Sequence, residues 1–257
     1  MKLQLLPSTC EEPGSATRGQ HFTCFVVNDR VAIDAGSLAT GVSAFQRENI
    51  RDVVLTHAHL DHIAGLPLFI DDLFSTLTDP VRIYAEQAVI DVLERDVFNW
   101  SVYPRFSELN NSHGPVVEYR TITAGSAFEA GGLSITPVNV NHKVPSSGFV
   151  ISDGMGSLAM TGDTASLDGF WDVANAVENL SGLLIECAFP DELAELASIS
   201  HHLTPSLLAR ELEKFEQDCP VYVVNLKPIY REKTAAEIAS LGRTGVEVMA
   251  VGRVYDF

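Results

Sequence analysis

Short apolar runs recur along the first part of the chain, separated by residues that favour turns. Runs of this length, bounded by Gly, Pro, Asn or Asp, are typical of buried β-strands. The turn residues Asn28 and Asp29 separate two of these runs and indicate a hairpin. We expect strands at Leu3–Leu6, Phe22–Val27, Val31–Asp34, Val53–Leu55 and Val81–Tyr84, and a turn-rich loop at Pro7–Gln20.

Two stretches of the same region change to the helical period. Apolar residues recur at three- and four-residue spacing from Leu66 to Leu77, and Pro67 suits the first turn of a helix there. A second helix is predicted at Glu86–Val97. Strands that alternate with helices in this way are typical of an α/β layer architecture.

The segment Asn99–Pro115 interrupts this alternation. It contains Trp100, Tyr103, Phe106 and His113 among polar residues and prolines. One interpretation is a lid or wall over a functional site, or a dimer contact, which long loops often supply. The other is a local hydrophobic cluster under a long loop. The sequence leaves both open.

After Val116 the pattern changes to closely spaced short strands. Gly131 with Gly132, and Asp153 with Gly154, are hairpin signals. No linker, low-complexity tract or short repeat divides the chain, so we expect one domain spanning residues 1–257. We predict strands at Val116–Ile122, Ala127–Phe128, Leu133–Val140, Gly148–Ser152, Ser157–Thr161, Leu183–Cys187, Val221–Val224 and Val246–Ala250, and helices from Thr204 to Phe215 and near Thr234–Leu241.

The composition narrows the class of protein. With 257 residues, 46% of them hydrophobic, the chain can bury a sizeable core. Its 17 basic and 34 acidic residues give a net charge of −17, which argues against a broad nucleic-acid-binding surface. Four scattered cysteines fit a reducing compartment. We found neither a signal peptide nor a membrane-length apolar run, so we expect a soluble, cytoplasmic protein without a membrane partner.

The candidate chemistry concentrates in the sequence HxHxDH at residues 57–62, directly after a predicted strand. Alternate residues of an extended chain point the same way, so His57 and His59 can offer ring nitrogens to one metal ion. Asp61 and His62 follow as the chain turns and can face a second ion. The alternatives are solvated loop histidines or a structural zinc, but a structural zinc usually has four closed ligands. We therefore interpret the motif as an open site for two metals.

Two further residues of ligand type follow predicted strands. His142 comes after the strand Leu133–Val140, and Asp163 comes after the strand Ser157–Thr161. Alone, each would more often be a turn or capping residue. Two ions need more ligands than HxHxDH provides, so we expect both residues to converge with the motif at one edge of a sheet. For Asp34, which ends an earlier strand, we expect a role in anchoring a turn rather than in catalysis.

The order of these features resembles the metallo-β-lactamase superfamily over nearly the whole chain. The resemblance implies an α/β fold, a four-layer αββα sandwich, whose two similar β-rich halves would account for the change near Val116. It also implies a ligand set for two ions. That set is His57, His59 and His142 on one ion, Asp61 and His62 on the other, and Asp163 as the bridge.

A narrower resemblance is to the class II cyclic nucleotide phosphodiesterases of this superfamily. The more specific matches are Ile-Asp-Ala-Gly at 33–36, the motif with its flanks at 56–66, and His-Leu-Thr-Pro at 202–205. The resemblance implies hydrolysis of a 3′,5′-cyclic nucleotide such as cAMP or cGMP, in which a water bridging the two metals attacks the phosphorus. Asp61 would orient that water. By analogy with tRNA 3′-processing endonucleases, His202 would act as general acid beside the phosphate.

The weaker matches lie at 147–151, 162–164, 186–190 and 226–228. They imply substrate contacts from Ser147, Thr164 and Lys227. A homodimer is a further expectation, from the resemblance and the aromatic segment Asn99–Pro115.

One position departs from the family pattern. The family usually has a last metal-binding His where this chain has Asn225. An amide oxygen is a poorer zinc donor than imidazole, so the second ion could be weakly held, be a harder metal such as manganese, or be absent. Asn225 could also only hydrogen-bond behind the ligands. We expect two divalent ions, zinc first, with manganese or iron as alternatives, and Asn225 as a weak ligand.

Several rival functions fit the same motif. A lactonase, a thioesterase and an RNA 3′-processing-like phosphodiesterase share the expected fold, and a metal-binding protein without turnover is a rival from another class. His202 with Thr204 and Pro205 favours phosphodiesters over lactones, and the acidic charge disfavours RNA. We expect a small-molecule phosphodiester as the substrate.

Overall fold

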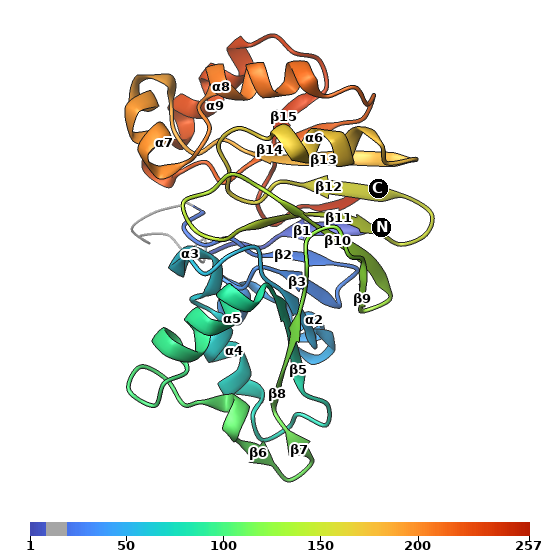
Figure 1. Ribbon diagram of the computed structural model, residues 1–257, viewed down its shortest axis with the longest axis vertical. Coiled ribbons are helices and arrows are strands. Elements are labelled where there is room, and N and C mark those ends of the chain that lie inside the picture. Colours follow the sequence, from blue (N-terminus) through green and yellow to red (C-terminus); the bar gives the residue numbers. More distant parts are fainter. Residues whose placement is uncertain (9–19) are drawn as a thin grey trace.

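The computed structural model describes residues 1–8 and 20–257. Most of the loop predicted at Pro7–Gln20, including Cys10, lies outside the described residues; Cys24, Cys187 and Cys219 form no disulfide. Figure 1 shows four layers along the long axis, with two sheets in the middle and helices on both outer sides. The predicted αββα sandwich is therefore confirmed.

The first sheet has seven strands in the order β16-β1-β2-β3-β4-β5-β8. They are β1 (Lys2–Leu5), β2 (Phe25–Val27), β3 (Val31–Ile33), β4 (Asp52–Val54), β5 (Val81–Ala85), β8 (Val117–Thr121) and β16 (Val254–Asp256). The predicted hairpin is confirmed, because β2 and β3 pair antiparallel and Asn28 and Asp29 adopt positive φ between them. From β3 to β8 the strands run parallel.

The second sheet repeats this plan in the order β15-β14-β13-β12-β11-β10-β9. It contains β9 (Phe128–Ala130), β10 (Leu133–Asn139), β11 (Ser147–Ser152), β12 (Ser157–Met160), β13 (Leu180–Glu186), β14 (Val221–Val224) and β15 (Val246–Val248). Both predicted hairpins, β9–β10 and β11–β12, are antiparallel. The second half begins at Phe128 and not near Val116 as predicted, since β8 pairs with β5 and completes the first sheet.

Helices cover the outer face of each sheet (Figure 1). Those before β8 are α1 (Leu38–Gly41), α2 (Ala44–Asn49), α3 (Leu60–Ile63), α4 (Leu66–Leu73) and α5 (Gln87–Val92); those after it are α6 (Asp168–Asn175), α7 (Ala194–Ser200), α8 (Pro205–Glu211) and α9 (Arg231–Ser240). The predicted helix after Leu66 is confirmed, with Pro67 in its first turn. The sequence pattern did not predict α1, α2, α6, α7 or β16.

Alternation along the strands divides the apolar core between the layers. Phe25 and Val27 of β2 belong to the core between the sheets, whereas Val26 packs with the helices of the first half. Successive side chains of a strand point to opposite faces, so one strand supplies two cores. A third core lies between the second sheet and α6, α8 and α9.

The segment Asn99–Pro115 contains a short 3₁₀ turn and the hairpin β6 (Asn110–Asn111) with β7 (Gly114–Pro115). Phe106 is 2% exposed and its ring packs on Phe98 and Tyr103, which confirms the hydrophobic-cluster interpretation. Figure 1 places β6 and β7 at the lower end of the long axis, well away from α3, which carries part of the HxHxDH motif. That hairpin therefore does not cover the motif, and the predicted dimer contact stays a prediction.

No helix in the described part of the chain combines the length and the apolar character needed to cross a lipid bilayer.

Candidate metal centre

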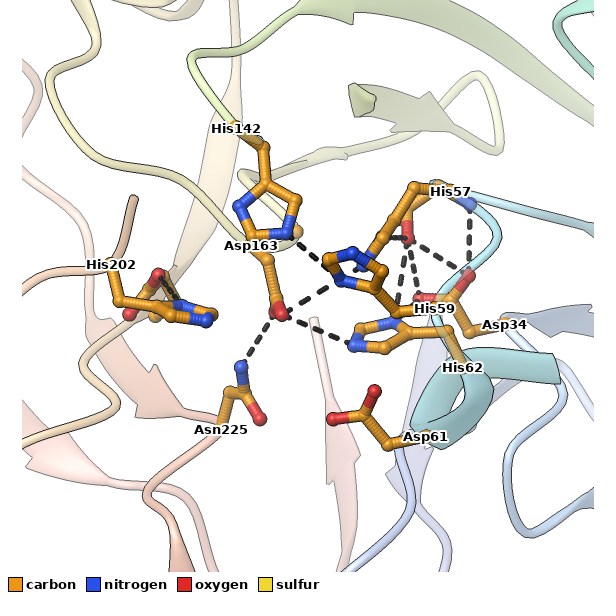
Figure 2. A network of polar contacts seen from close by, with 12 residues as sticks. Asp34, His57, His59, Asp61, His62, His142, Asp163, His202 and Asn225 are labelled. Carbon is orange, nitrogen blue, oxygen red and sulfur yellow. Dashed lines mark hydrogen bonds and ion pairs between the residues drawn. The ribbon is translucent and has the colours of Figure 1, made fainter. Parts of the chain in front are cut away.

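The ends of several strands meet at one edge of the sandwich and bring the predicted ligands together (Figure 2). HxHxDH follows β4, His142 follows β10, Asp163 follows β12 and Asn225 follows β14. Because β12, β13 and β14 run parallel, their carboxyl ends lie at the same edge. His202 reaches the same place from the turn after α7.

Three imidazoles form the first possible ligand group. The ligand atoms of His57, His59 and His142 all lie within 4.8 Å of one another. His142 Nε2 is 3.2 Å from His59 Nδ1. Nitrogens that share a tetrahedral zinc at the usual bond length are about 3.4 Å apart, so this pair already has the spacing of two ligands.

Asp163 connects this group to the other histidines of the cluster. Its Oδ2 lies 3.3 Å from His62 Nε2 and 3.9 Å from His57 Nε2. It also shares a possible ligand group with His142 and His202. Asp163 is only 2% exposed, so water screens the charge of its carboxylate little. The bridging role predicted for Asp163 is compatible with this central place and stays a prediction.

Hydrogen bonds behind the cluster fix which ring nitrogen faces inward. His62 Nδ1 donates to Asp34 Oδ2 at 2.7 Å, and His142 Nδ1 donates to the carbonyl of His201 at 3.1 Å. His57 Nδ1 lies 2.9 Å from the hydroxyl of Thr56, which itself donates to Asp34. These contacts hold the protons on Nδ1 and leave Nε2 free to bind a metal.

Two of those inward nitrogens have no hydrogen-bond partner among the described residues. They are Nε2 of His57 and Nε2 of His62, and both are buried. A buried polar atom without a partner costs about 1–3 kcal/mol, so such atoms usually have a ligand. A divalent ion satisfies this donor set, and the residues present therefore fit the metal that the fold implies.

Burial also sets the charge of the three-histidine group. It lowers the pKa of His57 and His59, and it lowers the pKa of His142 to about 4. The three rings are thus neutral at neutral pH, as metal ligands must be. His62 differs: burial lowers its pKa, but Asp163 and Asp34 raise it by more.

Asp34 anchors the motif, as expected, and its contacts reach farther than a turn. It adopts a positive φ of 59° after β3, which aims its carboxylate at the next parallel strand end. There it accepts hydrogen bonds from the backbone N–H and hydroxyl of Thr56 and from His62. Asp34 thus holds the ring of His62 directly, and that of His57 through Thr56, in one orientation.

Replacing Asp34 by Asn is therefore expected to weaken metal binding by about 10- to 100-fold, the usual effect of losing a partner behind a ligand. The carboxylate that holds the Thr56 hydroxyl beside His57 Nδ1 is lost, while the side-chain volume stays the same. Competition with a chelator of known affinity measures the change. The exposed Asp172→Asn is the matched control and keeps the parent affinity.

His202 is oriented by a buried carboxylate that the sequence analysis did not single out. Its Nδ1 donates to Glu186 Oε1 at 2.7 Å, and Glu186 is 0% exposed. Burial raises the pKa of Glu186, while His202 and the backbone N–H groups of Thr164 and Leu203, which donate to this carboxylate, favour its charged form. Burial lowers the pKa of His202, but Glu186 raises it by more, so the ring stays protonated to a higher pH than usual.

Asp61 makes a contact that the motif does not predict. Its Oδ2 lies 3.1 Å from the ammonium group of Lys227, and both side chains are more than two-thirds buried. Burial raises the pKa of Asp61, but His62 and Lys227 lower it by more. The pKa of Lys227 is raised, because Asp163 and Asp61 outweigh its burial. The two groups therefore form a charged pair beside the cluster.

Asn225 has a left-handed φ of 60° directly after β14. Its amide nitrogen donates to Asp163 Oδ1 at 2.6 Å, and Figure 2 shows its oxygen pointing away from that carboxylate. The Asn225 amide therefore donates a hydrogen bond to Asp163, a predicted metal ligand.

Ser147 and Thr164, predicted to touch the substrate, are instead buried inside the protein. Ser147 is 1% exposed and donates to Glu86 at 2.6 Å. Thr164 is 0% exposed and its hydroxyl accepts from the backbone of Asn141. Side chains without exposed surface position their neighbours, so the geometry does not favour direct substrate contact for either residue.

Known proteins share this architecture. A 3′,5′-cyclic-nucleotide phosphodiesterase of Yersinia pestis, named as probable, is 30% identical over 212 residues, which cover 72% of this chain and 60% of that protein. A ribonuclease Z of Bradyrhizobium diazoefficiens is 31% identical over 134 residues, covering 47% of this chain and 40% of that protein. The crystal structure of unliganded yeast PDE1 matches with a TM-score of 0.77, at 17% identity, over 98% of both chains.

These matches cover only part of the relatives' length, so they do not establish this protein's activity or substrate. The aligned part spans about 60% of the length of the phosphodiesterase relatives. The likeness to yeast PDE1, at 17% identity, establishes the fold alone.

A family model, the beta-lactamase superfamily domain, matches residues 30–222. That range includes HxHxDH, His142, Asp163 and His202, and it ends within β14 of the second sheet. With its αββα sandwich and its cluster of inward imidazoles, the chain belongs to the metallo-β-lactamase superfamily.

Proposed function

We propose that this protein is a metal-dependent phosphodiesterase that hydrolyses 3′,5′-cyclic nucleotides. One observation carries the proposal: His202, which donates from Nδ1 to the buried Glu186, lies beside the three-histidine group, with its ring centre 5.1 Å from that of His142. The contact with Glu186 raises the pKa of His202. An imidazolium next to a metal-binding cluster suits an anionic substrate and can give a proton to a departing oxygen.

Each group at the site has a part in this reaction. His57, His59 and His142 would hold a divalent ion, which when bound would supply positive charge to a phosphate oxygen and lower the pKa of water toward about 7. Asp61 orients the attacking water. His202 donates its Nε2 proton to the 3′ oxygen as the bond to phosphorus breaks, while Glu186 keeps the ring in place.

The surface beside His202 has room for the rest of a nucleotide. A hollow of about 520 Å³ is lined by His202, His201, Asn141, Leu207 and Arg210, among others. This volume lies within the usual range of small-molecule pockets, about 300–1,000 Å³. Leu207 gives it an apolar wall, and Arg210, Lys214 and Glu211 line it with charges of both signs.

The relatives support this substrate class and also name its main rival. The Yersinia pestis relative is by name a probable 3′,5′-cyclic-nucleotide phosphodiesterase. The Bradyrhizobium diazoefficiens relative is by name a ribonuclease Z, so RNA is the rival substrate. The net charge of −17 disfavours RNA, because RNA-binding surfaces release counterions through basic side chains.

A substrate panel tests the proposal. The purified full chain, supplied with zinc or manganese, is expected to hydrolyse 3′,5′-cAMP or 3′,5′-cGMP and also bis-p-nitrophenyl phosphate. A precursor tRNA, a lactone and a thioester serve as rival substrates in the same assay. Turnover confined to the precursor tRNA would replace the cyclic nucleotide with RNA, and turnover confined to the lactone or thioester would overturn the phosphodiesterase proposal.

A further inference from the structure

The residues predicted to hold the second ion do not all face one another. His62 and Asp163 lie together, with 3.3 Å between Nε2 and Oδ2. Asp61 and Asn225 each make another contact. Asp61 belongs to none of the possible metal-binding groups found among the described residues. The possible group of His57, His62 and Asp163 shares His57 with the three-histidine group, so an ion on the three histidines leaves His62 and Asp163 for a second ion. Two donors are fewer than the three protein ligands that a catalytic zinc usually has.

Asp61 is held by the ammonium group of Lys227. The Nζ–Oδ2 distance of 3.1 Å is that of a charge-assisted hydrogen bond. Lys227 is itself fixed, because its backbone N–H donates to the carbonyl of Ala188 at 3.1 Å and its side chain is only 27% exposed. The fold therefore places the ammonium group of Lys227 against Asp61, the carboxylate that the HxHxDH motif was expected to supply to a metal ion.

Asn225 contributes a donor where a metal needs a lone pair. Its Nδ2–Asp163 Oδ1 distance is 2.6 Å. The opposite orientation of the amide would put two oxygens at that distance, and they would repel each other. The N–H of Asn225 must therefore face Asp163. Its hydrogen bond occupies Oδ1 of that carboxylate.

We propose that this centre holds a single divalent ion, bound by His57, His59 and His142, and that the ammonium group of Lys227 replaces the second ion. Two-metal hydrolases use both ions to stabilise charge on the attacking and departing oxygens. Lys227 brings one compact positive charge with three donors to the same side of the cluster. It neutralises Asp61 and can donate to a phosphate oxygen.

The lysine of the family match at 226–228 thus lies next to the position where the chain departs from the family pattern. Asn225 and Lys227 lie two residues apart after β14, one removing a ligand and the other supplying a cation. The inference rests on the metal-dependent function proposed above, but its test counts ions and not turnover. Either can therefore fail without the other.

Metal stoichiometry tests the inference. The purified full chain is titrated with zinc in a calorimeter, and its metal content is measured by mass spectrometry after removal of loose ions. We expect about one tightly bound ion per chain and a single binding step. The double variant Asn225→His with Lys227→Met restores an imidazole and frees Asp61, so we expect it to bind about two ions, as two-metal centres do.

Lys143→Met is the matched control. It also removes a lysine close in sequence to a ligand, but Lys143 is exposed and is not part of the cluster, so its metal content stays that of the parent. Two tightly bound ions in the parent chain would overturn the inference without the need for any variant. A folded double variant that still binds one ion would show that Lys227 does not stand in the place of the second.

Discussion

His202→Ala is expected to lower turnover of a cyclic nucleotide by about 10²- to 10⁴-fold, the usual contribution of a general acid. The ring gives its proton to the 3′ oxygen, and alanine leaves that oxygen to depart as an anion. Metal content should stay at the parent level, because the three-histidine group does not include His202. Steady-state kinetics together with metal analysis measure both quantities.

An exposed histidine away from the site provides the control. His113 lies between β6 and β7, which Figure 1 places well away from the motif, so His113→Ala should keep turnover at the parent level. Loss of metal in His202→Ala would instead make His202 a ligand, and unchanged turnover would remove its catalytic role.

The contact with Glu186 sets the sign of the pH dependence in the same experiment. A general acid works only while protonated, and Glu186 raises the pKa of His202. Turnover is therefore retained above the usual imidazole range and falls as the pH rises through the raised pKa. Glu186→Gln removes the charge but keeps the shape, so the alkaline fall should move to lower pH. An unmoved profile would leave Glu186 with a structural role only.

Removal of the metal is the second change with a large expected effect. Chelation should abolish turnover, because the ion supplies the charge that binds phosphate and activates water. It should also destabilise the fold. An ion that binds only the folded state stabilises it by about 2.7 kcal/mol at a concentration one hundred times its dissociation constant. The buried Nε2 atom of His57 loses its ligand when the ion leaves.

Urea unfolding with and without chelator measures the stability, and the substrate assay measures the activity. Re-addition of zinc or manganese should restore both. His142→Ala lacks one ligand of the three-histidine group, so its stability should respond much less to zinc. Full turnover by a metal-free chain would contradict the metal-dependent mechanism.

Local pattern predicted much of the fold. The alternation in Phe25, Val26 and Val27 reflects a strand with one face on each of two cores, and Pro67 marks the first turn of α4. Shorter elements were missed. α1 has only four residues and α7 seven, too few for helical periodicity to stand out from the surrounding loop. β16 gains its place from pairing with β1 at the other end of the chain.

The site was predictable where one signal recurs, a ligand-type residue directly after a buried strand. This signal identified HxHxDH, His142 and Asp163. Glu186 gives the same signal at the end of β13, and it was missed because its partner His202 lies in a turn after a helix. A carboxylate at the end of a buried strand is therefore as strong an indication of a functional-site residue as a histidine there.

The sequence by itself determined which chemical groups are present at the strand ends, because apolar periodicity and turn residues record local burial and backbone preference. The motif predicted a metal-binding cluster, and the resemblance to the metallo-β-lactamase superfamily implied the αββα sandwich. Only the tertiary structure decided the partners: Asp34 with His62, Glu186 with His202, and Lys227 with Asp61, which is 166 residues away. Such contacts depend on which strand ends become neighbours, and strand order is set by packing of the whole chain rather than by any local pattern.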